Sequence, residues 1–299
     1  MYVFKLKTLI IAAAAAITVL LLLTLGICRF AAPHSKAVSG FSETGSDEYV
    51  ELPILMYHSL TKNPSKVNAY VINVSDFEND LKFLRDNGYT AVFISEVIDY
   101  VDGSGDLPDK PVAITFDDGF VNNYDYGLSL LEKYDMKCTV SIVGSYTEKF
   151  SSLTDDNPEY AYADYETVKN MADSGRYEIA SHSYDMHSLP DKSNPGARKG
   201  ASKNSGESDE DYRRILTEDT QKNRQLLEEN CGITPVVYTY PYGAISKSSM
   251  PILKELGYRA SLSCLEDTNH ISRGNTDGLF CLSRYLRDNK RSAAALLQK

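Results

Sequence analysis

The sequence has no tryptophan, few cysteines and histidines, and no excess of basic residues. Five cysteines and five histidines occur among 299 residues, and 41 acidic residues against 31 basic ones give a formal net charge of -10. The cysteines show no paired CxxC spacing, so neither a zinc ribbon nor a disulfide-rich scaffold is indicated, and buried thiols are expected. The acidic balance leaves no basic surface of the kind that a phosphate backbone requires, which argues against nucleic-acid binding. The remaining composition, 42% hydrophobic and 24% charged, fits a folded protein.

Charged residues are also absent from residues 8–28, a run rich in Leu, Ile and Ala that follows two lysines and precedes Arg29. A bilayer is spanned by about 20 apolar residues, so this run is long enough. A cleavable signal peptide is the alternative, but its apolar region usually has about 7–15 residues and no clear A-x-A site follows. We expect a cytoplasmic tail at 1–7 and an uncleaved transmembrane signal anchor at 8–28. The rest of the chain would then lie outside the cell membrane, or be secreted if the anchor is cleaved.

Residues 29–50 are rich in Ser, Gly, Ala and acidic residues and show no hydrophobic period, which is typical of a flexible stalk. Residues 51–299 form the predicted catalytic domain, in which short apolar runs alternate with segments of helical period. Runs rich in Val, Ile, Tyr and Phe are typical of strands buried on both faces. They lie at Leu52–Tyr57, Thr90–Ser95, Pro111–Phe116, Cys138–Val143, Tyr177–Ala180, Pro235–Tyr240, Tyr258–Ser263 and Leu279–Leu282.

The segments between these runs carry helix punctuation. Ser75-x-x-Glu78 reads as a capping box that opens a helix over Asp76–Asn87, with Gly88 as its stop signal. Further helices are expected at Tyr124–Tyr134, Tyr165–Ala172, Asp211–Asn230 and Ser248–Leu256. Seven to eight strand and helix units predict an α/β fold, a distorted or incomplete (β/α) barrel. In such a fold the chemistry lies at the carboxyl ends of the strands.

One segment interrupts this alternation. Residues 191–209 are mostly Ser, Lys, Gly, Asn and Glu, with almost nothing to bury. We expect a mobile surface insertion, either a solvated loop or a rim beside the histidines that precede it.

Two strand ends carry polar side chains that can act together. Pro111–Phe116 ends in Asp117-Asp118-Gly119, and Tyr177–Ala180 leads to His182 and His187. Adjacent aspartates are often only turn formers, and a histidine pair five apart lies on one face of neither a helix nor a strand. Because both strand ends belong at one edge of the sheet, however, a carboxylate and two imidazoles would meet there. This is a donor set of catalytic divalent metals.

Two further strand ends add candidates. The Pro241-Tyr242-Gly243 turn is either plain punctuation or a source of a backbone N–H for an oxyanion. His58 follows Leu52–Tyr57, and taken alone it reads as an ordinary, partly buried histidine.

Three motifs in this order resemble the polysaccharide deacetylase family, the NodB-homology carbohydrate esterases. They are Thr115-Phe116-Asp117-Asp118-Gly119, Ser181-His182-Ser183-x-x-x-His187 and Tyr240-Pro241-Tyr242-Gly243. The similarity covers Glu51–Arg284. Most family members space the histidines by four. The spacing of five and the Met56-Tyr57-His58 run resemble the branch that includes the poly-N-acetylglucosamine deacetylases.

The resemblance implies that Asp118, His182 and His187 hold a divalent metal, Zn²⁺ first, with Co²⁺ or Ni²⁺ as substitutes. Asp117 would be the general base, taking a proton from water. The backbone N–H of Tyr242 would stabilise the oxyanion. The substrate would be an N-acetylated polysaccharide.

The sequence departs from the family at two positions. Arg284 stands in Leu282-Ser283-Arg284, where most relatives have the histidine that serves as acid, so we expect His58 to be the acid. The arginine that commonly precedes the Pro-Tyr turn and steadies the base is missing. We expect Arg284 to reach Asp117 from the neighbouring strand and to lower the pKa of that carboxyl.

Two classes of function follow from this resemblance. One is an anchored hydrolase that removes N-acetyl groups from peptidoglycan, an exopolysaccharide or chitin-like chains outside the membrane, or O-acetyl groups from a polysaccharide. The other is a catalytically weak glycan-binding protein on the same fold, which has lost effective turnover through its altered acid and arginine positions. An aspartate that is not a ligand beside the metal favours catalysis, because binding alone does not need a base.

Overall fold

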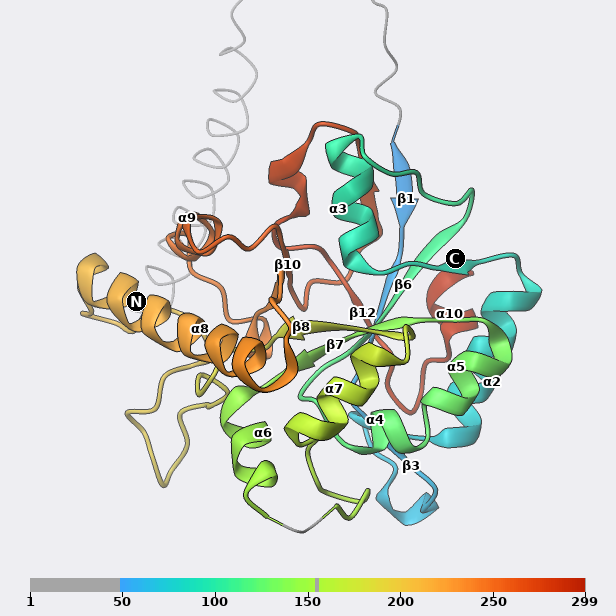
Figure 1. Ribbon diagram of the computed structural model, residues 1–299, viewed down its shortest axis with the longest axis horizontal. Helices are drawn as coiled ribbons and strands as arrows, with labels where there is room; N and C mark the ends of the chain where they lie inside the picture. Colours follow the sequence, from blue (N-terminus) through green and yellow to red (C-terminus); the bar gives the residue numbers. More distant parts are fainter. Residues whose placement is uncertain (1–48, 154–155, 299) are drawn as a thin grey trace, which may run out of the picture. The chain divides into compact units, whose positions relative to one another are not determined.

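The computed structural model describes residues 49–153 and 156–298 (Figure 1). The predicted tail at 1–7, the transmembrane segment at 8–28 and the stalk up to residue 48 lie outside the described residues. None of the helices in the described ranges is both long and apolar enough to cross a bilayer. Asp47–Lys299 is one compact unit.

A curled sheet of parallel strands forms the centre of this unit. Its strand order is β10-β9-β8-β7-β6-β2-β12, and β5 pairs with β6 off this path. The strands are β2 (Ile54–Tyr57), β5 (Thr90–Ala91), β6 (Pro111–Phe116), β7 (Cys138–Ile142), β8 (Tyr177–Ser181), β9 (Val237–Thr239), β10 (Ala260–Leu262) and β12 (Tyr285–Leu286). A parallel bridge between Leu262 and Leu282 connects β10 to the segment before β12. The sheet is thus a partial barrel of parallel strands, consistent with the predicted (β/α) architecture.

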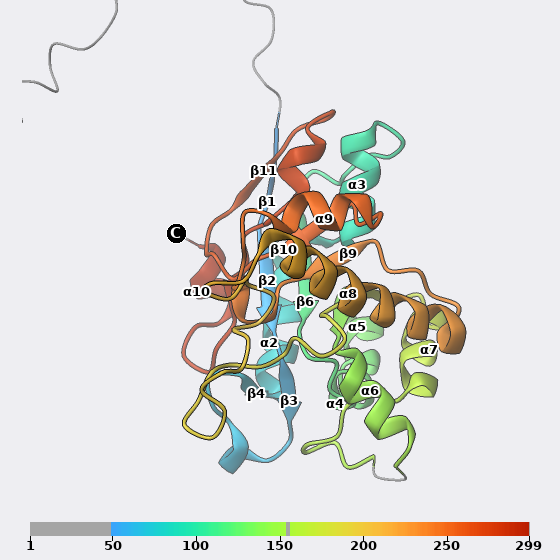
Figure 2. The same cartoon turned by 90° about the vertical axis from the view of Figure 1, so that its left-hand side faces the viewer.

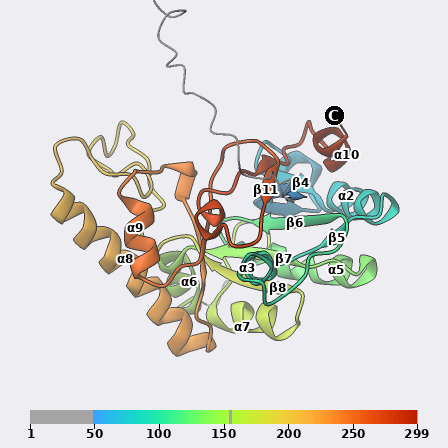
Figure 3. The same cartoon turned by 90° about the horizontal axis from the view of Figure 1, so that it is seen from above.

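Most helices lie around the outside of this sheet, whereas α3 (Ile94–Asp102) lies over the sheet in the view of Figure 3. The main ones are α2 (Val74–Asp86), α5 (Leu128–Tyr134), α7 (Tyr165–Asp173), α8 (Asp209–Cys231) and α9 (Ser249–Glu255). The others are α3, α4 (Asn122–Asp125), α6 (Gly144–Ser151), α10 (Ala293–Leu297) and the 3-10 turns η1 (Pro64–Lys66), η2 (Pro241–Gly243) and η3 (Thr276–Leu279). Two small sheets pair β1 (Val50–Leu52) with β11 (Asn269–Ile271) and β3 (Ser59–Thr61) with β4 (Val71–Asn73) (Figure 2).

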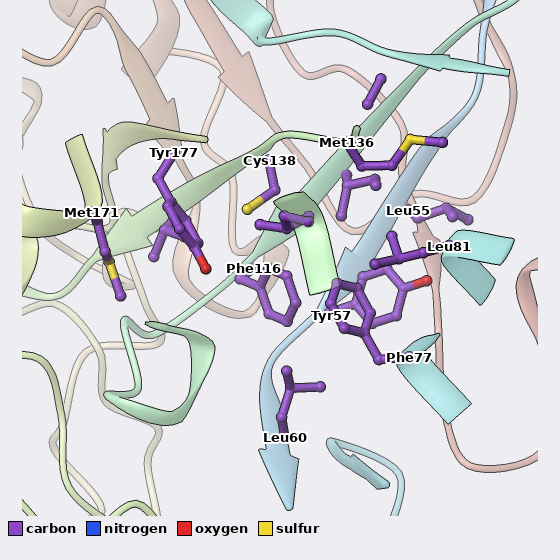
Figure 4. Packing of buried hydrophobic residues seen from close by; sticks show 14 of the residues in the cluster. Leu55, Tyr57, Leu60, Phe77, Leu81, Phe116, Met136, Cys138, Met171 and Tyr177 are labelled. Atoms are coloured by element: carbon purple, nitrogen blue, oxygen red, sulfur yellow. The ribbon is translucent and has the colours of Figure 1, made fainter. Parts of the chain in front are cut away.

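Strand β6 shows why the sheet has two different faces. Successive side chains of a strand point to opposite faces. Ile114 and Phe116 lie in the cluster between sheet and helices, where Phe116 contacts Tyr57 and Phe77 with ring centroids 5.2 and 5.3 Å away (Figure 4). Ala113 lies in a second cluster, which contains the apolar residues of α3. By the same alternation, Thr115 and Asp117 belong to the face that carries Ala113.

A half-buried carboxylate of β8, that of Glu178, explains one wrong prediction. The run Thr90–Ser95 was expected to be a strand, but only β5 is, and α3 begins at Ile94. Glu178 accepts hydrogen bonds from the backbone amides of Ile94 and Ser95 at 2.9 Å each and so satisfies the first N–H groups of α3. A cap supplied by a residue so far along the chain has no local sequence signal.

Other boundaries differ for local reasons. The predicted strand Leu279–Leu282 is wrong, because η3 ends at Leu279 and the strand that pairs with β2 is β12. The predicted cap Ser75 is wrong as well, since the side chain of Asn73 accepts from the amide of Ser75 at 3.0 Å.

Among the thiols, Cys138 and Cys231 are buried as expected, whereas Cys264 is exposed and Cys281 is only half-buried.

The insertion at 191–209 is irregular up to Ser208, as expected, with α8 beginning at Asp209. Its second half nevertheless buries residues, contrary to the sequence reading. Ala201 is fully buried, and its carbonyl accepts a hydrogen bond from the Tyr212 hydroxyl at 2.8 Å. Arg198 and Glu207 form a salt bridge across this half. The packing of Ala201 against α8 explains why a polar segment keeps a defined path; its mobility stays a prediction.

Candidate active site

The predicted site residues follow the carboxyl ends of neighbouring strands. Asp117 and Asp118 come directly after β6, and His58 follows β2, which pairs with β6. His182 follows β8, and Tyr242 lies in η2, just after β9. Parallel strands bring their carboxyl ends to one edge of the sheet, so the fold gathers these side chains at one place.

Asp118, His182 and His187 form a cluster of potential metal ligands. One donor atom of each lies within 4.8 Å of the others. Nε2 of His187 is 3.0 Å and Nε2 of His182 is 3.5 Å from Oδ1 of Asp118. His182 is buried, while the other two side chains are partly accessible at 13–14%. The structure therefore brings together the three predicted ligands despite the spacing of five between the histidines.

The other ring nitrogens of both histidines face away from Asp118 and have partners. His182 Nδ1 lies 2.8 Å from the carbonyl oxygen of Thr239, which fixes Nδ1 as the donor and leaves Nε2 as a lone-pair donor. His187 Nδ1 lies 3.1 Å from the Tyr242 hydroxyl. Asp118 Oδ1 is buried, and apart from the two Nε2 atoms it has no polar partner among the described residues. A buried carboxylate oxygen left unmatched beside two Nε2 atoms fits a divalent cation with open coordination positions.

Left-handed backbone conformations occur at three non-glycine residues of the site. Asp118, Ser183 and Tyr242 have φ of 73°, 71° and 57°. Such residues cost roughly 1–3 kcal/mol each and persist only where the surrounding structure enforces them. Gly119 follows with φ 74°, a conformation that glycine adopts without strain and that the tight turn requires. A side chain would not fit there either, because its Cβ would lie 2.8 Å from Cδ1 of Ile142. The turns that present the candidate ligands are thus strained but held by the fold.

Arg284 is fully buried and pairs with Asp117 through two parallel hydrogen bonds. Its Nη1 donates to Oδ1 at 2.7 Å, and its Nη2 donates to Oδ2 at 2.8 Å. Its Nε donates to the carbonyl of Ser263 at 2.8 Å, which orients the guanidinium. Burial alone would raise the pKa of Asp117, but Arg284, together with the smaller effects of His182 and His58, offsets burial and holds that pKa below its ordinary value of 3.8.

The predicted contact of Arg284 is therefore present, but its predicted origin is wrong. Arg284 directly precedes β12, and β2 lies between β12 and β6 in the sheet. The arginine reaches Asp117 because Thr115 and Asp117 point to the inner face, where Nη1 also contacts Oγ1 of Thr115 at 3.1 Å. A curled sheet shortens the path between inner-face residues that are not on adjacent strands.

His58 lies close enough to the two aspartates to feel both charges. Burial lowers the pKa of His58 from its ordinary value of 6.5, and Asp117 and Asp118 offset part of that change. Its Nδ1 is buried without a hydrogen-bond partner among the described residues, and the ring contacts the edge of Tyr70, with centroids 5.0 Å apart. Tyr70 itself is 57% exposed. The ring is thus placed beside the aspartates with an unused nitrogen.

Sequence reasoning missed the residues that orient the histidines. Tyr146 lies 3.4 Å from His187 Nδ1, and its ring packs against both His187 and Tyr162. Tyr146 belongs to α6, a helix that was not predicted. Thr239 acts through its backbone carbonyl, so its side-chain type carries no signal for this role.

Comparison with known proteins agrees with this site. The sequence model of the polysaccharide deacetylase family matches residues 104–261, a range that contains both aspartates, both histidines and Tyr242. The poly-beta-1,6-N-acetyl-D-glucosamine N-deacetylase of Escherichia coli K12 is 26% identical over 219 residues, which are 68% of this chain and 32% of that protein. The enzyme of the same name from Staphylococcus aureus is 25% identical over 203 residues, 67% of this chain and 63% of that protein. The chain thus spans about a third of the Escherichia coli protein.

Solved structures share the fold. A de-N-acetylase from Aggregatibacter actinomycetemcomitans has a TM-score of 0.69 at 23% identity, covering 83% of this chain and 99% of that one. The deacetylase PplD from Streptococcus pyogenes has a TM-score of 0.66 at 21% identity, covering 84% and 98%. The family match spans more than half of the sequence, and with the metal-ligand cluster and the ordered motifs it shows that this chain belongs to the polysaccharide deacetylase family of hydrolases.

Proposed function

We propose that this protein is a metal-dependent hydrolase that removes N-acetyl groups from an N-acetylglucosamine polysaccharide. The observation that carries the proposal is the pair of adjacent aspartates with different surroundings. Asp117 is held ionised by Arg284, and Asp118 lies with two histidines. A glycan-binding protein does not need an arginine-held base beside a ligand cluster, so this arrangement favours catalysis over binding alone.

Asp118, His182 and His187 would hold the metal, which we propose to be Zn²⁺, with Co²⁺ or Ni²⁺ able to replace it. When bound, the ion would supply a Lewis acid that polarises the acetamide carbonyl and makes a water molecule more acidic. The histidines are prepared for this role, because hydrogen bonds at Nδ1 direct both Nε2 atoms toward Asp118.

The remaining steps use side chains of this chain. Asp117 takes the proton of the attacking water as hydroxide adds to the acetyl carbon. The backbone N–H of Tyr242, in its left-handed turn, would donate to the developing oxyanion. The carbon–nitrogen bond then breaks, and His58 in its protonated form gives a proton to the leaving amine, so that acetate and a free amino sugar result.

The surface around the site suits a sugar polymer. Several exposed large apolar side chains of the described residues lie in segments without regular structure or, for Tyr242, in the η2 turn. They are Tyr70, Leu153, Tyr160, Leu189, Tyr242 and Leu265. Two of the tyrosines contact site histidines, since the rings of Tyr70 and His58 have centroids 5.0 Å apart and those of Tyr242 and His187 have centroids 4.5 Å apart. Each of these tyrosines therefore offers an apolar ring and a hydroxyl beside the site. The names of the relatives make poly-β-1,6-N-acetylglucosamine the first substrate to test.

The proposed setting is the outer face of the cell membrane, with the chain anchored by residues 8–28 or secreted after cleavage. Its basis is the uncharged apolar run in the sequence. In that setting an exopolysaccharide or the peptidoglycan of the cell wall would be within reach of the catalytic unit.

Acetate release from matched substrates tests the proposal. The purified protein, loaded with Zn²⁺ or Co²⁺, is given β-1,6-linked and β-1,4-linked N-acetylglucosamine oligomers of equal length, peptidoglycan and acetylated xylan. We expect release from the β-1,6-linked oligomers, abolished by a chelator. Release from xylan alone would replace the proposal by O-acetyl esterase activity. No release from any substrate by a folded, metal-loaded sample would favour a glycan-binding protein.

A further inference from the structure

The loop between the two candidate histidines has no regular structure of its own to hold it. Strand β8 ends at Ser181, and His187 must return to within 3.0 Å of Asp118 Oδ1. In between, Ser183 takes a left-handed φ of 71°, and its hydroxyl accepts a hydrogen bond from the amide of Met186 at 3.0 Å. The position of the His187 ring therefore depends on whatever fixes the backbone of residues 183–186.

Helix α8 supplies that support through one carboxylate. Asp219 accepts hydrogen bonds from two consecutive loop amides: Oδ1 from Tyr184 at 2.9 Å and Oδ2 from Asp185 at 2.7 Å. Both oxygens of the side chain are thus used on the backbone of the loop. A carboxylate that accepts two backbone amides in parallel defines the orientation of the peptide plane between them, which a single contact would leave free to rotate.

A second residue of α8 extends the support to the strand end. Asn223 lies one helical turn after Asp219, on the same face of the helix, and is fully buried. Its Nδ2 donates to the carbonyl of Ile142 at 3.1 Å and to Oγ of Ser181 at 2.8 Å. Polar residues at this spacing thus fasten α8 to the ends of β7 and β8 as well as to the loop.

The loop is bonded on its other side by the start of α6. The carbonyl of Ser183 accepts from the amide of Gly144 at 3.1 Å, and the carbonyl of Tyr184 accepts from the amide of Ser145 at 2.8 Å. Between α6 and Asp219, the backbone groups of Tyr184 are satisfied in both directions. With the backbone of the loop held from both sides, the side chain of His187 is directed at Asp118.

We propose that Asp219 is a positioning residue of the metal site, whose carboxylate fixes the Ser183–Met186 loop so that His187 presents Nε2 beside Asp118. The inference rests on the proposed metal site and adds a residue from a distant helix to it. Burial raises the pKa of Asp219 to about 6, although the two loop amides oppose that rise. Burial thus disfavours the charged form of Asp219, and the hydrogen bonds from the two loop amides favour it.

Metal affinity separates this role from a merely structural one. The full protein is purified as wild type, Asp219→Ala, Asp219→Asn and Glu218→Gln, and its affinity for Zn²⁺ is measured by competition with a chelating indicator. Glu218 is the control, since it is the adjacent residue of the same helix and pairs on the surface with Arg214, the two side chains being 64% and 56% exposed. The visible spectrum of the Co²⁺ form and the thermal unfolding of the metal-free protein are recorded beside it.

Residues that orient metal ligands typically change metal affinity about 10- to 100-fold when mutated. We expect Asp219→Ala to weaken Zn²⁺ binding at least tenfold, Asp219→Asn to fall between Ala and wild type because one acceptor oxygen remains, and Glu218→Gln to stay within twofold of wild type. The Co²⁺ spectrum should change in both Asp219 variants. Should the Ala variant not fold, the Asn variant decides.

Wild-type affinity in the folded Asp219 variants would overturn the inference, even if the metal-free protein were less stable, because that result assigns Asp219 a structural role only. In that case the proposed function would stand, since the wild type still binds metal. If the wild type binds neither Zn²⁺ nor Co²⁺, the proposed metal site and this inference both fail.

Discussion

Replacing Arg284 by methionine tests the pairing of Arg284 with Asp117, the feature in which the site departs most from the family pattern. The change keeps a long side chain in the barrel but removes the charge and both hydrogen bonds to Asp117, at 2.7 and 2.8 Å. Both partners are buried, with side chains 0% and 3% exposed. Removing one partner of such a pair leaves an uncompensated buried charge and typically costs about 3–5 kcal/mol. For a domain of this size that corresponds to a fall in Tm of roughly 10 °C.

The pH dependence of this loss follows from the pKa of Asp117. In the wild type that pKa is lowered on folding, so the pair stabilises the protein above the unfolded value of 3.8, and this contribution is lost as the pH falls through the folded pKa. In Arg284→Met the buried carboxyl has no cation, and its pKa rises above the unfolded value. The stability difference between wild type and variant should therefore be large at pH 8 and shrink toward pH 4.

Urea unfolding of both proteins between pH 4 and pH 8 measures this difference. The control is Arg259→Met, which removes an arginine paired on the surface with Asp102, the side chains being 45% and 31% exposed. A screened pair of that kind contributes at most about 1 kcal/mol. The acid limb of the deacetylation rate should also move to higher pH in Arg284→Met, because the base must be ionised. A stability difference that does not change across this range, together with an unchanged rate profile, would show that Arg284 does not hold Asp117 ionised.

Three further predictions concern the acid, the metal ligands and a second buried pair. His58→Asn should keep Zn²⁺ affinity while lowering kcat about 100-fold or more, as removal of a general acid does; a kcat within twofold of wild type would exclude His58 as the acid. Zn²⁺ should raise the Tm of the wild type in proportion to the logarithm of its concentration, and His187→Ala should abolish that rise; a retained rise would remove His187 from the ligand set. Asp80→Asn should destabilise the protein by about 3 kcal/mol, because Asp80 is buried and pairs with buried Arg287 at 2.6 Å; a loss under 1 kcal/mol in chemical denaturation would show that the pair is replaceable.

The sequence was sufficient to predict which strand ends carry the site. Strand β6 has the predicted bounds, and the residues after it are the two aspartates, because a continuous apolar run that ends in Asp-Asp-Gly has a sharp boundary. The histidine pair was predicted as a cluster without knowing the loop, since parallel strands bring their carboxyl ends together. The predicted roles of metal ligand, base and acid came from the family resemblance, whereas the contacts between these residues come from the structure.

Contacts between distant segments could not be predicted in the same way. Arg284 pairs with Asp117 from the position just before β12, a strand two positions from β6 in the sheet, which requires the curvature of the barrel. Glu178 caps α3, and Asp219 supports the histidine loop. Both carboxylates bind backbone N–H groups, which every residue except proline has, so the side chains of the contacted residues do not reveal the contact. The same reason explains why the burial of Ala201 was missed: its environment comes from α8, not from its polar neighbours in the chain.

We propose above that Asp117 acts as a base beside a metal held by Asp118 and the two histidines. The most direct test of this proposal is acetate release from N-acetylglucosamine oligomers by metal-loaded wild type, chelator-treated wild type and metal-loaded Asp117→Asn, with bound metal measured in each sample. We expect release only from the metal-loaded wild type, with Asp117→Asn retaining its metal and working at least about 100-fold more slowly. Near wild-type release from Asp117→Asn, or from a sample shown to contain no metal, would contradict the proposal.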